Sequence, residues 1–176
     1  MDVVIRLATH HDVPALEVLI PESVLALQKN DYSLQQMEGA LGTVFGVDSQ
    51  LIEDGTYLVA EAGSNVVACG GWSKRQTLFG SNCVPGKNDA LLHPGRDAAR
   101  IRAFFVHPGW ARQGIGSRIL KACEAAAEAQ GFTHFELGAT LSGEPLYRAR
   151  GYRAIERFQF PLCNGEFLSL IRMAKP

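Results

Sequence analysis

The distribution of hydrophobic and polar residues along the chain predicts short strands that alternate with helices. Seven runs rich in apolar and β-branched residues predict strands, at residues 3–7, 57–62, 66–72, 99–106, 132–137, 152–160 and 166–173. Apolar residues that recur every three or four positions predict a helix from residue 13 and a longer one over 114–130. Two less regular helices are expected at 33–43 and 144–150.

Cap and turn residues mark where several of these elements begin and end. The pattern at residues 9–12 is typical of a capping box and precedes the first helix, which Pro21 is expected to end or kink. Gly131 is well placed to end the long helix as its C′ residue. Turn-forming residues between the second and third strands predict a hairpin, and Gly70-Gly71 predicts a bulge or a close backbone approach.

The order of the predicted elements indicates an α/β (α+β) fold with a mixed, mostly antiparallel central sheet of about seven strands and flanking helices. The strand–helix–strand unit at 99–137 is expected to form a right-handed parallel crossover. The length fits one domain, residues 1–176. Residues 74–97 are predicted to be irregular, and a loop of this length tends to be functional or mobile.

Composition and charge argue against several classes of protein. The net charge of −1 gives no support for a nucleic-acid partner, which usually requires a basic excess. No apolar stretch is long enough to cross a membrane and no secretory signal opens the chain, so we expect a cytoplasmic protein. The four cysteines form no Cys-x-x-Cys pair, and no metal site is predicted.

The chemistry is predicted at the loop between the fourth strand and the long helix. Gly114 and Gly116 can present backbone N–H groups to an anion there, because they carry no Cβ and the helix N-terminus adds unpaired donors and partial positive charge. Alone, Gly-x-Gly fits a tight turn with close helix packing equally well. A dinucleotide fingerprint needs a small residue where Ile119 stands, and a P-loop needs Gly-Lys-Ser/Thr, whereas Gly116 is followed by Ser117-Arg118.

Two stretches of the sequence resemble a known family. Residues 99–120 are similar to the acetyl-CoA site of the GNAT superfamily of N-acyltransferases, in which Gln/Arg-x-x-Gly-x-Gly/Ala follows a strand ending in Val-x-Pro. The later run Pro145-Leu-Tyr-Arg-Ala-Arg-Gly-Tyr152 resembles that family's Phe/Leu-Tyr-x-x-x-Gly-Phe/Tyr element. The departure from the pattern is Ala111 at its first position, with Arg112 beside it.

The resemblance implies a GNAT-like fold with a parallel β-α-β unit that binds acetyl-CoA as cosubstrate. The edge of the fourth strand would pair with the peptide-like pantetheine arm, through Phe104, Phe105 and Val106. The loop would hold the pyrophosphate, through Arg112, Gln113, Gly114, Ile115, Gly116 and Ser117. Arg118 and Lys121 are further candidates for contacts to the phosphates.

The implied reaction is acetyl transfer from the thioester to a primary amine. Tyr147 is the candidate general acid, because a phenol with a pKa near 10 can protonate a departing thiolate with a pKa near 8.5. The alternative for Tyr147 is an aromatic that only packs, and Tyr152 is expected in the core. The sequence does not single out a general base among Glu22, His93, Asp97 and His107.

The acceptor and the assembly stay open at this stage. Small-molecule amines and peptide amines both fit, and a homodimer is compatible with the sequence. The alternative function is a non-catalytic CoA-binding or interaction module, which would keep the glycine loop and lose the acid. Residues 74–97 are expected to border the acceptor site, since they lead into the strand that would hold the pantetheine arm.

Overall fold

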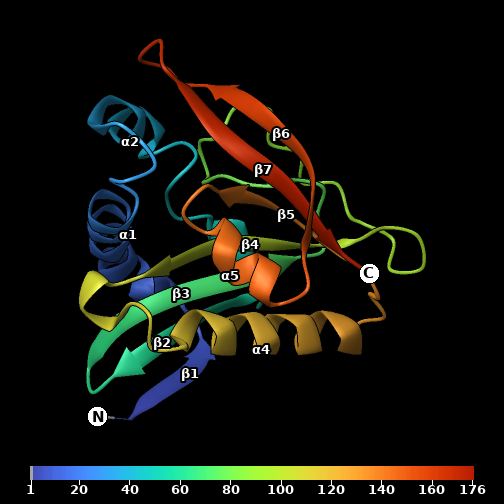
Figure 1. Ribbon diagram of the computed structural model, residues 1–176. Coiled ribbons are helices and arrows are strands. Elements are labelled where there is room, and N and C mark those ends of the chain that lie inside the picture. The colour runs from blue at the N-terminus through green and yellow to red at the C-terminus, as the bar shows by residue number, and fades with distance from the viewer. Residues whose placement is uncertain (1) are drawn as a thin grey trace.

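A computed structural model describes residues 2–176, and within them the chain forms one seven-stranded sheet in the order β1-β2-β3-β4-β5-β7-β6 (Figure 1). The strands are β1 (Val3–Leu7), β2 (Tyr57–Ala62), β3 (Asn65–Ser73), β4 (Ala99–Val106), β5 (Phe135–Thr140), β6 (Arg153–Pro161) and β7 (Phe167–Lys175). The helices are η1 (His10–Asp12), α1 (Val13–Leu27), α2 (Leu34–Ala40), α3 (Ser49–Glu53), η2 (Pro108–Trp110), α4 (Ile115–Ala129) and α5 (Glu144–Ala149).

The pairing of β4 with β5 sets this sheet apart from a simple meander. All other neighbouring strands are antiparallel, whereas β4 and β5 are parallel and share only the pairs Ala99↔Phe135 and Arg100↔Glu136. Beyond Arg100 the two strands therefore run apart. The mixed, mostly antiparallel sheet and its parallel β-α-β unit are confirmed as predicted.

Helices cover both faces of the sheet (Figure 1). On one face, α4 buries Ile115, Ile119 and Cys123 against the sheet in a core that includes Ala68. On the other face, α1 packs the side chains that its helical spacing aligns, Leu16, Leu19, Ile20 and Val24, against Tyr57, Val59 and Cys69. Successive residues of β2 and β3 thus point to opposite cores, as strand alternation requires.

The bounds of three elements differ from the predictions by three residues or more. Helix α1 does not end at Pro21 but continues to Leu27, because buried apolar side chains on both sides of the proline hold it to the sheet despite the lost hydrogen bond. Helix α2 ends at Ala40, where Leu41 turns extended, rather than at residue 43. Strand β5 begins at Phe135 rather than at 132, because the Phe132 N–H bonds Ala127 O at the end of α4.

Other expectations at chain turns are confirmed. The capping box at residues 9–12 is present, and Gly131, which follows α4, has φ of +94°. The β2–β3 hairpin forms as predicted. Helix α3 was not predicted, because five residues are too few to show a helical period; Asp48 caps it by accepting a hydrogen bond from the Gln50 N–H at 3.0 Å.

Residues 74–97 contain no helix or strand of the described chain, as predicted, but the segment is fastened at several points. Arg75 forms two hydrogen bonds to Asp54 at 2.8 and 2.9 Å. Thr77 and Asn88 bond each other across the loop through the Thr77 hydroxyl. None of the helices in residues 2–176 has the length and apolar character needed to span a membrane.

Candidate active site

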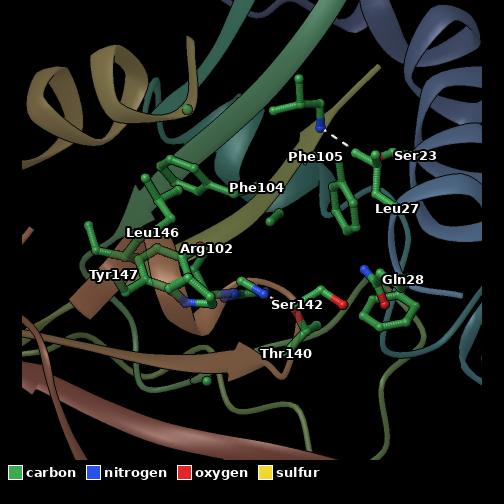
Figure 2. Close-up of a pocket in the computed structure, with 18 of the residues that line it drawn as sticks. Ser23, Leu27, Gln28, Arg102, Phe104, Phe105, Thr140, Ser142, Leu146 and Tyr147 are labelled. Carbon is green, nitrogen blue, oxygen red and sulfur yellow. Dashed lines mark hydrogen bonds between the residues drawn. The ribbon is translucent and has the colours of Figure 1, made fainter. Parts of the chain in front are cut away.

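A cavity of about 520 Å³ opens where β4 and β5 run apart (Figure 2). Strand β4 and the glycine loop line it on one side, and α5 and the loop after β5 line it on another. The cavity reaches the end of α1 at Leu27 and Gln28 and the loop segment at Phe79 and Gly80. These four regions lie far apart in the sequence, and only the fold brings them together.

A β-bulge in β4 shapes this opening. The register places Ala103 and Phe104 of β4 opposite the single residue Gly70 of β3, which confirms the bulge predicted at the two glycines. Ala103 adopts a left-handed φ of +59°, a conformation that costs about 1–2 kcal/mol for a residue with a Cβ. The Tyr57 hydroxyl donates to Ala103 O at 2.9 Å, and a Cβ at Gly70 would lie 2.7 Å from the Phe104 ring. These contacts hold the strained turn of β4 in place.

The edge of β4 beyond the bulge is free of strand partners among the described residues. His107 donates its N–H to Val67 O of the β3 side at 2.8 Å, so alternation directs the N–H groups of Val106 and Phe104 to the free edge. The Val106 N–H donates to Ser23 Oγ of α1 at 3.2 Å. An extended polar ligand in the cavity can therefore pair with this edge as an added strand would.

The glycine loop presents unpaired donors at the start of α4. The first helical bond there runs from Arg118 N–H to Gly114 O at 3.1 Å, so the N–H groups of Ile115, Gly116 and Ser117 have no carbonyl partner within the helix. Gly114 takes φ of +81°, which explains why a glycine stands there. A Cβ on Gly116 would lie 3.3 Å from Leu146 Cδ2, which is closer than ordinary van der Waals contact, whereas a Cβ on Gly114 would meet no atom within 4 Å. This donor set fits a pyrophosphate.

The basic residues around the loop have different surroundings. Arg112 lines the cavity, whereas Gln113 does not, and its side-chain amide donates to Gly109 O at 3.4 Å. Arg118 donates to Val3 O of β1 at 3.0 Å and lies outside the cavity. A further basic residue lies here that the sequence analysis missed: Arg150 Nε donates to Ser117 Oγ at 3.2 Å, beside the helix N-terminus. The Arg150–Ser117 contact depends on the fold and leaves no pattern in the sequence.

Tyr147 of α5 lies in the wall of the cavity with its ring edge-on to Phe104, at 6.2 Å between ring centroids (Figure 2). Burial raises the pKa of its phenol well above the usual range, so the hydroxyl carries its proton at every physiological pH. Tyr152 packs against the other side of Tyr147, and its hydroxyl donates to Glu124 at 2.9 Å. The predicted core position of Tyr152 is confirmed, since the residue is 2% exposed.

Two buried polar groups in the cavity wall were missed by the sequence analysis. Arg102 of β4 donates from Nη2 to Asp48 at 2.8 Å and to Gly80 O at 2.7 Å, but its Nε has no hydrogen-bond partner among the described residues. The Oε1 atom of Gln28, the C-cap of α1, is likewise buried without a partner. Burial lowers the pKa of Arg102, against the effect of Asp48. Each unsatisfied group costs about 1–3 kcal/mol. The sequence did offer a signal for Arg102, because it is a charged residue inside an otherwise apolar strand.

The four residues considered for a general base lie outside the cavity. His107 Nε2 is 3.4 Å from Glu22 Oε2 in a pair on the surface. The His93 N–H donates to Asp97 at 2.7 Å in the irregular segment. Among residues 2–176, the cavity lining contains no Asp, Glu, His or Lys. An amine that enters the cavity must therefore lose its proton to water or before it binds.

Comparison with known proteins agrees with this geometry. A family model described as an acetyltransferase (GNAT) domain matches residues 53–154, which span β2 to the start of β6 and include the glycine loop and Tyr147. No curated protein matches the chain by sequence.

Solved structures with a similar fold cover nearly the whole chain at low sequence identity. A GCN5-related N-acetyltransferase from Rhodopseudomonas palustris has a TM-score of 0.72 and 21% identity, over 99% of this chain and 96% of that one. A PaiA N-acetyltransferase from Thermoplasma acidophilum, crystallised in complex with coenzyme A, has a TM-score of 0.67 and 14% identity, over 99% of each chain. A ribosomal-protein-alanine N-acetyltransferase from Brucella melitensis has a TM-score of 0.63 and 21% identity, over 98% of each chain. These similarities establish the shared fold.

Proposed function

Because the chain belongs to the GNAT family of acetyltransferases, we propose that it transfers an acetyl group from acetyl-CoA to a primary amine in the cavity between β4 and β5. One observation carries the proposal: a single cavity joins the unpaired N–H groups at the start of α4, the free edge of β4 and the Tyr147 ring. The cavity lies between β4 and β5 of one sheet that includes strands from β1 to β7, so we further propose that residues 1–176 act as one domain.

Each part of the site has a proposed role. The N–H groups of Ile115, Gly116 and Ser117, with Arg112, would hold the pyrophosphate of acetyl-CoA. The free edge of β4 from Phe104 to Val106 would pair with the pantetheine arm and aim the thioester along the cavity. Acetyl-CoA supplies the activated acetyl group, and the protein supplies orientation, which is worth several orders of magnitude in rate.

Tyr147 is proposed as the general acid that gives its hydroxyl proton to the departing sulfur. Burial raises the pKa of the Tyr147 phenol, which makes it a weaker acid. The same water-poor surroundings also disfavour a thiolate, so the anions of the phenol and of the thiol are both destabilised. Proton transfer from the phenol to the sulfur is therefore less unfavourable than the pKa values in water suggest. The transfer would leave the phenol to be reprotonated by solvent after product release.

The proposal is tested by measuring the release of coenzyme A thiol from acetyl-CoA with a panel of primary amines. Thiol release that depends on both the protein and an amine, with the acetylated amine identified by mass spectrometry, is the expected result. Tight binding of coenzyme A by calorimetry with no acetylated product from any amine would favour a CoA-binding module without turnover.

A further inference from the structure

The far wall of the cavity carries hydrogen-bonding groups that the proposed acetyl-CoA contacts leave unused. Gln28 Oε1 and Arg102 Nε are the two buried side-chain atoms among the described residues that have no hydrogen-bond partner, and both residues line this cavity. Gln28 is 7% exposed and Arg102 is 3% exposed, so bulk water does not satisfy either group. In the view of Figure 2, Gln28 lies beside Ser142, and the Arg102 side chain extends from beside Tyr147 toward Ser142.

These groups require a ligand that both donates and accepts hydrogen bonds. Arg102 Nε can only donate, so it needs an oxygen of the ligand. Gln28 Oε1 accepts, and the broad last torsion of the side chain lets the amide turn either end to the cavity. The Ser142 hydroxyl donates to Asp31 Oδ2 at 2.6 Å, which leaves its oxygen lone pairs as acceptors at the cavity. A neutral primary amine has two N–H donors for two such acceptors and keeps its own lone pair for attack.

The absence of a base in the lining selects among amines. Because the cavity lining within residues 2–176 contains no Asp, Glu, His or Lys, the amine has to arrive neutral in a useful fraction. A peptide α-amino group has a pKa of about 7.7–8.0 and a lysine side chain about 10.4, so at pH 7 the neutral α-amine is about 10²–10³-fold more abundant. A carboxylate next to the amine would favour its charged form, whereas a neutral carbonyl would not.

The remaining walls of this part of the cavity are apolar. They are formed by Leu27, Val44, Phe45, Leu78, Phe79 and Leu170. Arg102 already forms an ion pair with Asp48, and Asp48 also pairs with Lys87 at 2.9 Å. The wall therefore suits an uncharged oxygen and a hydrophobic side chain.

Resting on the proposed function, we propose that the acceptor is an α-amino group next to a neutral carbonyl, as in a peptide N-terminus or an amino acid amide, with an apolar side chain. The Gln28 amide and Ser142 Oγ hold the amine, and Arg102 Nε holds the carbonyl oxygen. The amine lone pair forms the new bond to the acetyl carbon, the carbon–sulfur bond breaks, and the sulfur leaves with the electron pair. The surplus amine proton goes to solvent, and the products are an N-acetyl amide and coenzyme A.

The experiment compares amines that share one apolar side chain. L-leucinamide, the tripeptide Leu-Gly-Gly, L-leucine and 3-methylbutylamine are each offered with acetyl-CoA, and kcat/KM is expressed per neutral amine to remove differences in pKa. We expect leucinamide to exceed 3-methylbutylamine by at least tenfold and L-leucine to fall below leucinamide. The ratio of kcat/KM for the tripeptide to kcat/KM for leucinamide distinguishes a peptide acceptor from a small-molecule acceptor.

A matched pair of variants tests the contact between the cavity wall and the amine. Because Gln28 contacts the amine that both compounds carry, Gln28→Met should lower kcat/KM at least tenfold for leucinamide and for 3-methylbutylamine alike, and keep both the acetyl-CoA affinity and Tm at or above wild-type values. Gln35→Met, which changes an exposed glutamine, should alter none of these.

Two results would overturn the inference while leaving the acetyltransferase function standing. One is equal or better use of 3-methylbutylamine by the wild type, or no transfer to leucinamide at all. The other is an unchanged kcat/KM for both amines in Gln28→Met. Failure of the protein to bind acetyl-CoA would instead contradict the proposed function itself.

Discussion

At the scale of single residues, the site depends on backbone positions as much as on side chains. Ala103 holds its left-handed conformation because the Tyr57 hydroxyl bonds its carbonyl and Gly70 leaves room for Phe104. Without the bulge, β4 would continue straight, and Phe104 and Val106 would present different atoms to the cavity. The strain is thus local and lies directly beside the proposed reaction centre.

The phenol of Tyr147 should matter for turnover and little for binding. In Tyr147→Phe we expect kcat to fall about 10²–10⁴-fold, with the Kd for acetyl-CoA within twofold, because only the proton donor is lost. Tyr152→Phe is the control, since it removes a phenol hydroxyl that bonds Glu124 outside the cavity. Because burial raises the pKa of Tyr147, its ionisation should not cause a fall in kcat up to about pH 10. Equal kcat in wild type and Tyr147→Phe, with chemistry rate-limiting, would remove Tyr147 from this role.

The missing side chain of Gly116 should be needed for cofactor affinity. Gly116→Val places methyl groups before the N–H donors, and losing one charge-assisted hydrogen bond of about 1.5–3 kcal/mol weakens binding at least tenfold. Calorimetric titration with acetyl-CoA measures the change. Ala125→Val, an exposed position in the same helix, controls for the valine itself and should bind normally. An unchanged Kd in folded Gly116→Val would show that the phosphates bind elsewhere.

At the scale of elements, the sequence predicted the strands and helices that have a regular hydrophobic period and missed the features that tertiary packing decides. All seven strands and α4 were found because their periods extend over many residues. Helix α3 was not predicted, since it is one short turn. The continuation of α1 beyond Pro21 was not predicted either, since packing decides it. Within the site, the glycine loop has a local pattern, whereas Gln28, Arg102 and Ser142 meet only through tertiary structure.

The irregular segment at residues 74–97 should act on the acceptor and not on the cofactor. Leu78, Phe79 and Gly80 line the cavity, and Phe79 packs against Phe160 at 5.0 Å between ring centroids. In Phe79→Ala we expect KM for the amine to rise about tenfold, the scale of a change in an apolar pocket, while the Kd for acetyl-CoA stays unchanged. Leu91→Ala, in the same segment but 63% exposed, is the control. An unchanged amine profile in Phe79→Ala would assign the segment no part in acceptor choice.

At the scale of the whole molecule, the sheet is two parts joined across a narrow seam. Strands β1 to β4 and strands β5 to β7 share only two residue pairs, at Ala99 and Arg100. An ion pair strengthens the seam, because Arg100 of β4 binds Glu136 of β5 at 3.2 Å, and Arg172 of β7 also binds Glu136, at 3.1 Å. A ligand that occupies the opening contacts both parts and should hold them together.

Acetyl-CoA should therefore stabilise the native protein measurably. At 100 times Kd, a ligand that binds the native state alone adds about 2.7 kcal/mol to the free energy of unfolding. For a chain of this length that corresponds to a rise in Tm of about 5–10 °C. Differential scanning calorimetry measures the shift, which should fall by about half or more in Gly116→Val at the same ligand concentration and be kept in Ala125→Val. Binding by titration without any rise in Tm would mean that the unfolded chain binds equally well.

The outer strand β6 has a consequence for how the protein behaves in concentrated solution. Strand β6 is nine residues long and exposes Ile155, and within residues 2–176 its outer edge has no strand partner. Another molecule can add a strand to an edge of this kind. Charged side chains interrupt that edge at Arg153, Glu156 and Arg157, and Pro161 lacks the N–H donor that a further strand would need. Salt screens such charges over about 10 Å at 0.1 M and over shorter distances above it. At high ionic strength, precipitation of this protein should accordingly start with contacts between β6 edges, and the substitution Ile155→Lys should delay it.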